Sequence, residues 1–87
     1  MGRTSREKPA RLGEKLLQVR NAFGLSQNDI LSRLGLTERL SRDDISKYER
    51  GVREPSLLVL LRYARAAGIS TDVLIDDELN LPARLRK

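Results

Sequence analysis

The chain has 87 residues and a net charge of +5, from 17 Lys and Arg against 12 Asp and Glu, and it contains no cysteine and no histidine. This length fits one small domain, and the composition excludes disulfides, thiol or imidazole nucleophiles and the common zinc sites. The longest apolar run, Leu57 to Leu61, is far shorter than the about 20 residues that cross a bilayer, and the first residues lack the apolar core of a signal peptide. We therefore expect a non-enzymatic, cytoplasmic protein without cofactor, metal or membrane contact, and its basic balance suits a polyanionic partner.

A basic arm precedes the first predicted helix. Residues 1–8 form this arm, and its positive side chains are Arg3, Arg6 and Lys8. Such a charge run is often only a solvated tail, so the role of the arm stays open. Apolar residues spaced by four, three and four positions then predict a helix that begins near Pro9 and ends at Gly24. The buried stripe of this helix is Leu12, Leu16, Val19 and Phe23.

The pattern Leu-Ser-x-x-Asp-Ile occurs at residues 25–30 and again at residues 40–45. In each copy the Ser hydroxyl can accept from a first-turn N–H, the Asp can reach back to the cap, and the Leu can pack on the Ile. Both copies therefore predict helix starts. The inward-facing residues of the second helix are Ile30, Leu31 and Leu34, and those of the third are Ile45 and Tyr48.

Glycines mark where these two helices end. The second helix is predicted to end at Gly35, and the third runs from about Arg42 to Arg50, before Gly51. A start at Thr37 would lengthen the third helix, but it would lack the apolar staple, so we favour Ser41 as its cap.

A fourth helix is predicted after Pro55 and Ser56, and a short fifth helix begins near Ser70 or Thr71. Their apolar stripes are Leu57, Leu60, Leu61 and Ala64 in the fourth, and Val73 and Leu74 in the fifth. The acids Asp76, Asp77 and Glu78 do not have the spacing of a calcium loop, so they indicate a solvated linker. We expect residues 77–87 to form a flexible tail, with basic residues Arg84, Arg86 and Lys87.

Motifs at ordered spacings run through the five predicted helices. They are Leu12 Gly13 through Arg20, Gly24 Leu25 Ser26 Gln27, Ile45 through Gly51, Arg53 through Leu57, Ala64, and Gly68 Ile69 Ser70. Together they resemble the Cro and lambda-repressor-like (XRE-type) helix-turn-helix family over roughly residues 10–76. The resemblance implies an all-α, compact five-helix lambda-repressor-like bundle at residues 9–76. It also implies an ion pair between Arg20 and Glu49, which would tie the first helix to the third.

The resemblance further implies DNA contacts. The base-reading positions, on the outer face of the third helix, are Arg42, Asp43, Ser46 and Lys47. Arg42 suits bidentate contact with guanine, and Lys47 suits a second guanine or a phosphate. Asp43 could accept from cytosine or could only interact with the helix dipole, and both alternatives stay open. The phosphate-contacting positions are Gln27, Arg50, Arg53, Arg3 and Arg6. For Gln27 the phosphate contact is favoured over the alternative of an ordinary exposed first-turn residue.

The chain departs from the family pattern between its second and third helices. Four more residues than usual separate Gly35 from Ile45, because residues 36–40 enlarge the turn. The family also prefers a small residue where this chain has Leu31. A longer turn and a larger side chain could compensate each other.

Two functions are consistent with these sequence features. The first is sequence-specific binding of double-stranded DNA by a transcriptional regulator, expected to be a repressor and a homodimer. A homodimer is expected because one such module buries little area on DNA. The expected dimer contacts are Val73, Ile75 and Leu79. The alternative is a protein-interaction module of the same fold, such as an antitoxin or a regulator-binding protein. Adjacent Asp43 and Asp44 point about 100° apart on a helix and cannot form a facing acid–base pair, so we do not expect an enzyme.

Overall fold

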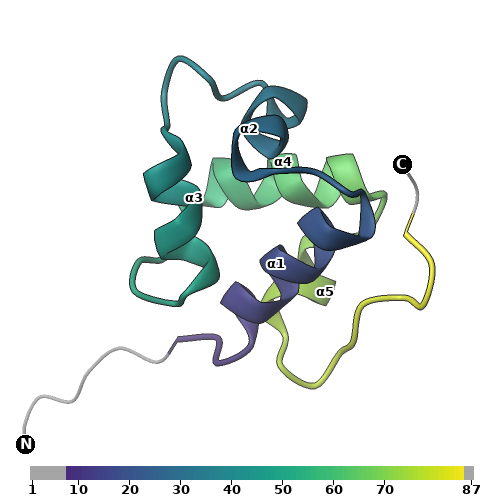
Figure 1. Ribbon diagram of the computed structural model, residues 1–87. Coiled ribbons are helices and arrows are strands. Elements are labelled where there is room, and N and C mark those ends of the chain that lie inside the picture. The colour runs from purple at the N-terminus through teal and green to yellow at the C-terminus, as the bar shows by residue number, and fades with distance from the viewer. Residues whose placement is uncertain (1–7, 86–87) are drawn as a thin grey trace, which may run out of the picture.

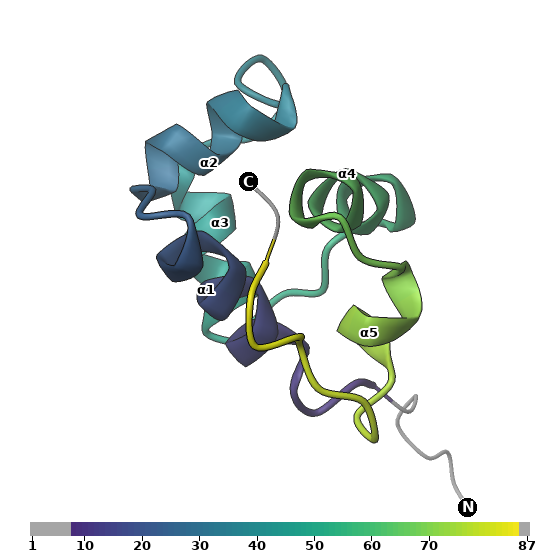
Figure 2. The same ribbon diagram turned by 90° about the vertical axis from the view of Figure 1, so that its right-hand side faces the viewer.

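The computed structural model describes residues 8–85 and shows an all-α domain over this range. Its helices are α1 (Leu12–Ala22), α2 (Gln27–Leu34), α3 (Arg42–Glu49), α4 (Leu57–Ala67) and α5 (Thr71–Ile75). The predicted order of five helices is confirmed, including the start of α3 after Ser41. Figure 1 shows α2 and α3 joined by a long connection, and Figure 2 shows α1, α2 and α3 on one side with α4 and α5 on the other. No helix in the described range is long and apolar enough to cross a membrane.

The helix caps follow the repeated sequence pattern. At α2 the Ser26 hydroxyl accepts from the Asp29 N–H at 3.0 Å, and the Asp29 carboxylate accepts from the Ser26 N–H at 3.1 Å. At α3 the Asp44 carboxylate accepts from the Ser41 N–H at 2.9 Å, and the Ser41 hydroxyl donates to the same oxygen at 3.3 Å. The α2 pair satisfies two backbone donors that a helix start would otherwise leave unpaired, and the α3 pair satisfies one, the Ser41 N–H. Both helices begin where the pattern predicted.

One continuous core joins the five helices. Helix α1 packs on α3 and α5, α2 packs on α3 and α4, and α4 packs on α5. The largest fully buried apolar side chains are Leu16, Val19, Ile30, Ile45, Tyr63 and Leu74. Because every helix contributes to this set, removing these surfaces from water stabilises the packing of all five together, at about 25 cal/mol for each Å² of apolar area.

The buried face of α4 differs from the predicted stripe. Leu57, expected inside, is 82% exposed, and Leu61 is only half-buried. The buried residues of this helix are Val59, Leu60, Tyr63, Ala64 and Ala67. An apolar run has no polar face that fixes the rotation of a helix, so the choice depends on which residue fits the core. Here the Tyr63 ring is fully buried in the core, and this rotation of α4 turns Leu57 towards solvent.

Helices α1 and α3 approach each other closely at Gly13. A Cβ atom at this position would lie 2.8 Å from the carbonyl oxygens of both Tyr48 and Glu49, closer than side chains and backbone tolerate. The missing side chain therefore allows the start of α1 to lie directly against the end of α3. This contact fixes the position of α3 relative to the rest of the bundle.

Residues 76–80, which the sequence indicated as a solvated linker and the start of a flexible tail, make hydrogen bonds to residues at the start of α1. The Asp77 carboxylate accepts from the N–H groups of Ala10 and Arg11, at 2.8 and 3.0 Å, and so serves as the missing cap of α1. The buried Lys15 ammonium donates to the carbonyls of Val73 and Asp76, at 2.8 and 2.9 Å. The Arg11 guanidinium adds bonds to the carbonyl of Asp77 and to the side chain of Asn80, both at 2.8 Å.

Further along this segment, Leu81 and Leu85 are half-buried and pack against the core. We call residues 10–15 and 73–80, with the bonds between them, the terminal clasp. Because Asp77 supplies the cap, α1 begins at Leu12 and not near Pro9. The side chain that caps a helix can lie far along the chain from it, and no local sequence pattern then predicts the cap.

Candidate nucleic-acid interface

An ion pair also joins α3 to α1. The Arg20 guanidinium donates to both Glu49 carboxylate oxygens, at 2.7 and 2.9 Å, and to the carbonyl of Leu25 at 3.0 Å. The Glu49 side chain is 5% exposed and the Arg20 side chain 16% exposed. This ion pair confirms the expectation drawn from the family resemblance. The hydrogen bond to Glu49 raises the pKa of Arg20, so the guanidinium stays charged at any ordinary pH.

Gln27 joins the same network from α2. Its amide nitrogen donates to Glu49 Oε1 at 3.2 Å, so α1, α2 and α3 meet at one buried carboxylate. The sequence-based prediction assigned Gln27 to a phosphate, or to an ordinary exposed position, and did not include this bond. The side chain is half-buried at the start of α2, where the backbone N–H groups of the helix attract anions.

The four predicted base-reading residues share the outer face of α3. Arg42 and Asp43 are exposed, and Ser46 and Lys47 are half-buried, whereas Ile45 and Tyr48 are buried on the opposite face. Lys47 Nζ lies 3.3 Å from a carboxylate oxygen of Asp43, one turn earlier. An exposed pair of this kind contributes less than about 1 kcal/mol, so either partner can exchange it for a stronger contact.

Arg50 and Arg53 extend the basic surface past the end of α3. The Arg50 guanidinium donates to the Ser46 hydroxyl at 3.2 Å. Arg53 Nη1 lies 2.6 Å from a carboxylate oxygen of Asp44. The sequence-based prediction missed this pair, because the spacing of the two residues does not indicate that the loop folds back onto the first turn of α3.

Asp44 therefore connects two parts of the interface. Its carboxylate accepts from the Ser41 N–H at the start of α3 and from Arg53 in the loop after it. The Ser41 N–H holds the pKa of Asp44 below its ordinary value, and the charge of Arg53 lowers it further. The Arg53 side chain stays half-exposed, so its guanidinium can contact a second anion without leaving this position.

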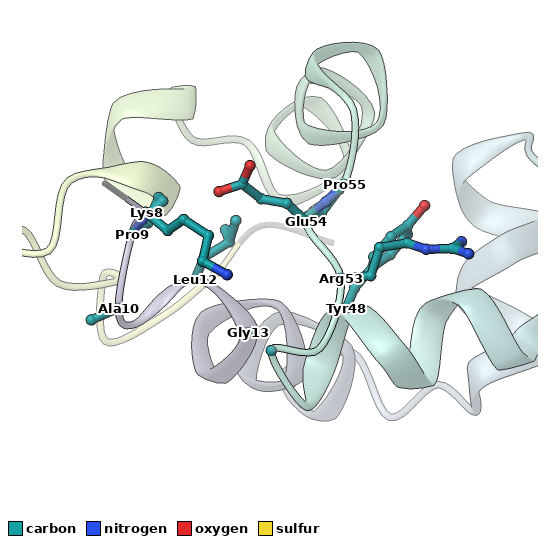
Figure 3. A pocket seen from close by; sticks show the side chains of 10 residues that line it. Lys8, Pro9, Ala10, Leu12, Gly13, Tyr48, Arg53, Glu54 and Pro55 are labelled. Atoms are coloured by element: carbon teal, nitrogen blue, oxygen red, sulfur yellow. The ribbon is translucent and has the colours of Figure 1, made fainter. Parts of the chain in front are cut away.

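Lys8, the last residue of the basic arm, lies beside a small cavity of about 290 Å³ (Figure 3). Leu12, Tyr48 and Pro55 are among the residues that line it, together with the charged residues Lys8, Arg53 and Glu54. Figure 3 shows that the Arg53 side chain points away from Lys8. Arg3 and Arg6, the remaining predicted phosphate contacts, lie outside the described residues.

These features define a class of protein. Two short helices in tandem, with the second held by a buried ion pair and facing outward with polar and basic side chains, form a helix-turn-helix unit inside a five-helix bundle. A family model described as helix-turn-helix matches residues 16–74. The chain belongs to the XRE-type helix-turn-helix family.

Two known proteins are similar to this chain. The SPbeta prophage-derived uncharacterized HTH-type transcriptional regulator YonR of Bacillus subtilis (strain 168) is 38% identical over 63 residues, which cover 72% of this chain and 55% of that protein. The chain thus spans about half the length of this curated relative. The crystal structure of the restriction-modification controller protein C.AhdI from Aeromonas hydrophila is 34% identical, with a TM-score of 0.62. That match covers 75% of this chain and 92% of the other.

Proposed function

We propose that the protein is a transcriptional regulator, a repressor, that binds double-stranded DNA sequence-specifically by inserting α3 into the major groove. The observation that carries this proposal is the outer face of α3, where Arg42, Ser46 and Lys47 lie together on a helix that the Arg20–Glu49 pair holds in position. The similarity to a transcriptional regulator and to a restriction-modification controller protein supports it. DNA as the partner would place the protein in the cytoplasm.

The residues of α3 take different roles in this proposal. Arg42, exposed in the first turn, would make the bidentate contact with guanine, and Lys47 would contact a second guanine or a phosphate. Ser46 can donate to or accept from a base edge. Asp43 lies beside Lys47, so it either orients that ammonium or accepts from cytosine.

Residues around α3 would hold the DNA backbone. Gln27 and the first turn of α2 would contact one phosphate, and Arg50 and Arg53 would contact phosphates beyond the end of α3. Arg3 and Arg6 in the basic arm would add charge that follows the duplex. These contacts position the protein without reading the sequence, because phosphates are the same at every base pair.

We further propose a homodimer on a two-fold symmetric site. A single module of this size buries about 600 to 1,000 Å² on DNA, and a second copy raises the affinity. Of the expected dimer contacts, Val73 is half-buried, while Ile75 and Leu79 are each 40% exposed. Leu57 and Leu58 are more exposed still and would gain most from burial against a second copy. Sedimentation that shows a monomer both alone and on selected DNA would contradict the dimer.

Selection from random DNA duplexes, followed by sequencing of the bound fraction, tests the function directly. Enrichment of one motif with two symmetric halves is the expected result. If no motif is enriched and all duplexes bind equally weakly, the proposal is wrong and the protein-interaction module of the same fold becomes the better interpretation. Arg42→Ala serves as the specificity control, because it should alter the enriched motif at one base pair of each half.

A further inference from the structure

The connection between α2 and α3 is longer than the family pattern, and the structure shows that it has a defined shape. Leu36 is buried, and its N–H donates to the carbonyl of Leu31 at 2.9 Å. The N–H groups of Arg39 and Leu40 then donate to the carbonyl of Leu36, at 3.0 and 2.9 Å. Half-buried Leu40 packs against the core at the other end of the connection.

Hydrogen bonds from α4 anchor the start of this connection, at the end of α2. The Arg62 guanidinium donates to the carbonyl of Leu34 at 2.8 Å and to that of Gly35 at 3.3 Å. These carbonyls belong to the end of α2, where the helix would otherwise leave acceptors unpaired. The connection is therefore attached at both ends, and its tip, residues 37–39, is exposed. We call residues 36–40 the inserted turn.

The inserted turn lies next to the proposed reading helix. In both views it forms the uppermost part of the molecule, beyond the first turn of α3 (Figures 1 and 2). Between this turn and α2 lies an open groove of about 700 Å³. Leu31, Ser32, Thr37, Leu40 and Arg42 are among the residues that line it. A base-reading candidate and the inserted turn thus share one surface.

The charges of the tip suit contact with DNA at one residue in particular. Arg39 is exposed, and its guanidinium has no hydrogen-bond or ionic partner within residues 8–85. A guanidinium without a partner can contact a phosphate without first breaking another bond, and its planar N–H groups match the phosphate oxygens. Glu38, its exposed neighbour, would oppose the same contact. Asp29 also lines the groove, where its carboxylate is held by the Ser26 N–H.

We infer that the inserted turn is a second DNA-contacting element, in which Arg39 contacts a phosphate just outside the base pairs that Arg42 reads. This inference rests on the proposed function, since it needs α3 in the major groove. Arg39 lies only three residues before Arg42 in the chain. Successive phosphates along one strand are about 3.4 Å apart along the DNA axis, so a phosphate next to the base pairs that Arg42 reads is the contact we assign to Arg39. The protein would therefore cover a longer half-site than a relative without the turn.

The test uses the full chain and the duplex selected from the random pool. Arg39→Ala should weaken binding several-fold at physiological salt and lower the salt slope by about 0.9, the value for one phosphate that the protein no longer neutralises. Glu38→Gln should strengthen binding. Arg65→Ala is the matched control, because Arg65 is an exposed arginine in the last turn of α4, at the end of that helix that points away from α3 (Figure 1).

Neutral methylphosphonate linkages, placed one at a time along the selected duplex, locate the contact. At one position outside the base pair affected by Arg42→Ala, the neutral linkage should weaken the wild-type protein and have no effect on Arg39→Ala. If the two changes add at every position, or if Arg39→Ala behaves as Arg65→Ala does, the inference is wrong. That result leaves the proposed function intact so long as Arg42→Ala still alters the base preference. If the wild-type protein selects no motif, both this inference and the proposed function are wrong.

Discussion

Arg20 and Glu49 join α1 to α3 through two parallel N–H···O bonds of 2.7 and 2.9 Å, around a carboxylate that is almost completely buried. The geometry explains why a residue of the first helix affects a helix two elements away. It also makes the pair asymmetric, because Arg20 can reach solvent more easily than Glu49 can.

Arg20→Ala should therefore destabilise the protein strongly. The change leaves the Glu49 charge buried without its main partner, and the expected loss in unfolding free energy is about 3 kcal/mol. Arg20→Lys should recover only part of this loss, because an ammonium cannot make two parallel bonds. Chemical denaturation measures both variants. A loss in Arg20→Ala as small as that of exposed Arg65→Ala would show that the pair does not hold α3.

Gly13→Ala tests the close approach of α1 to α3. In an ordinary helix this change stabilises by up to about 1 kcal/mol, because alanine has the higher helix propensity. Here the new methyl group would meet two carbonyl oxygens at 2.8 Å, and we expect a net loss of about 1 to 3 kcal/mol. Thermal melts of Gly13→Ala beside Gln18→Ala, an exposed position on the same helix, decide the sign. A more stable Gly13→Ala protein would contradict this close packing.

Acid should destabilise the protein through its capping carboxylates. Backbone N–H groups hold the pKa values of Asp29, Asp44 and Asp77 below the ordinary value of 3.8. The stabilisation is complete above that ordinary value, which applies to the unfolded chain, and it is lost as the pH falls towards the lowered values of the folded state.

Asp77→Asn should accordingly lower the melting temperature at neutral pH and reduce the further loss on going to about pH 3. Glu38→Gln, at an exposed position in the inserted turn, is the control and should leave the acid-induced loss unchanged. Differential scanning calorimetry over this pH range measures both. An unchanged pH profile in Asp77→Asn would mean that the carboxylate does not cap α1 in solution.

Arg42 and Arg53 should affect DNA binding differently. Arg42→Ala should lose about 1 to 3 kcal/mol on the preferred site and tolerate substitution at one base pair. Arg53→Ala should weaken all duplexes alike and lower the salt slope by about one unit. Titrations against single-base variants at several salt concentrations separate these results. Uniform weakening by Arg42→Ala would reassign it to phosphate contact.

Because Arg53 also pairs with Asp44, its effect on binding needs a structural control. Asp44→Asn removes the same ion pair and keeps the arginine. If Asp44→Asn weakens binding as much as Arg53→Ala does, the pair positions α3 and Arg53 does not contact phosphate.

The sequence predicted the parts of the fold that local patterns determine. The capping pattern located the starts of α2 and α3, and the family resemblance supplied the Arg20–Glu49 pair. The rotation of α4 was predicted incorrectly, because Leu57 belongs to a run without a polar face. For the interface, the sequence indicated which residues share the outer face of α3. It could not indicate the bond from Gln27 to Glu49 or the Asp44–Arg53 pair, since both depend on how separate segments meet.

The terminal clasp also determines when the domain can be completed. On the ribosome the chain emerges from its N-terminus, so α1 leaves the exit tunnel long before Asp77 is added. Until then the first N–H groups of α1 lack their partner, and the Lys15 ammonium lacks the carbonyls that make its burial tolerable. The helices can pack together earlier, but the hydrogen bonds at the start of α1 form only after residues more than sixty positions later have been translated. The segment that closes the domain is therefore made only after all five helices, and this order separates the onset of folding from its completion.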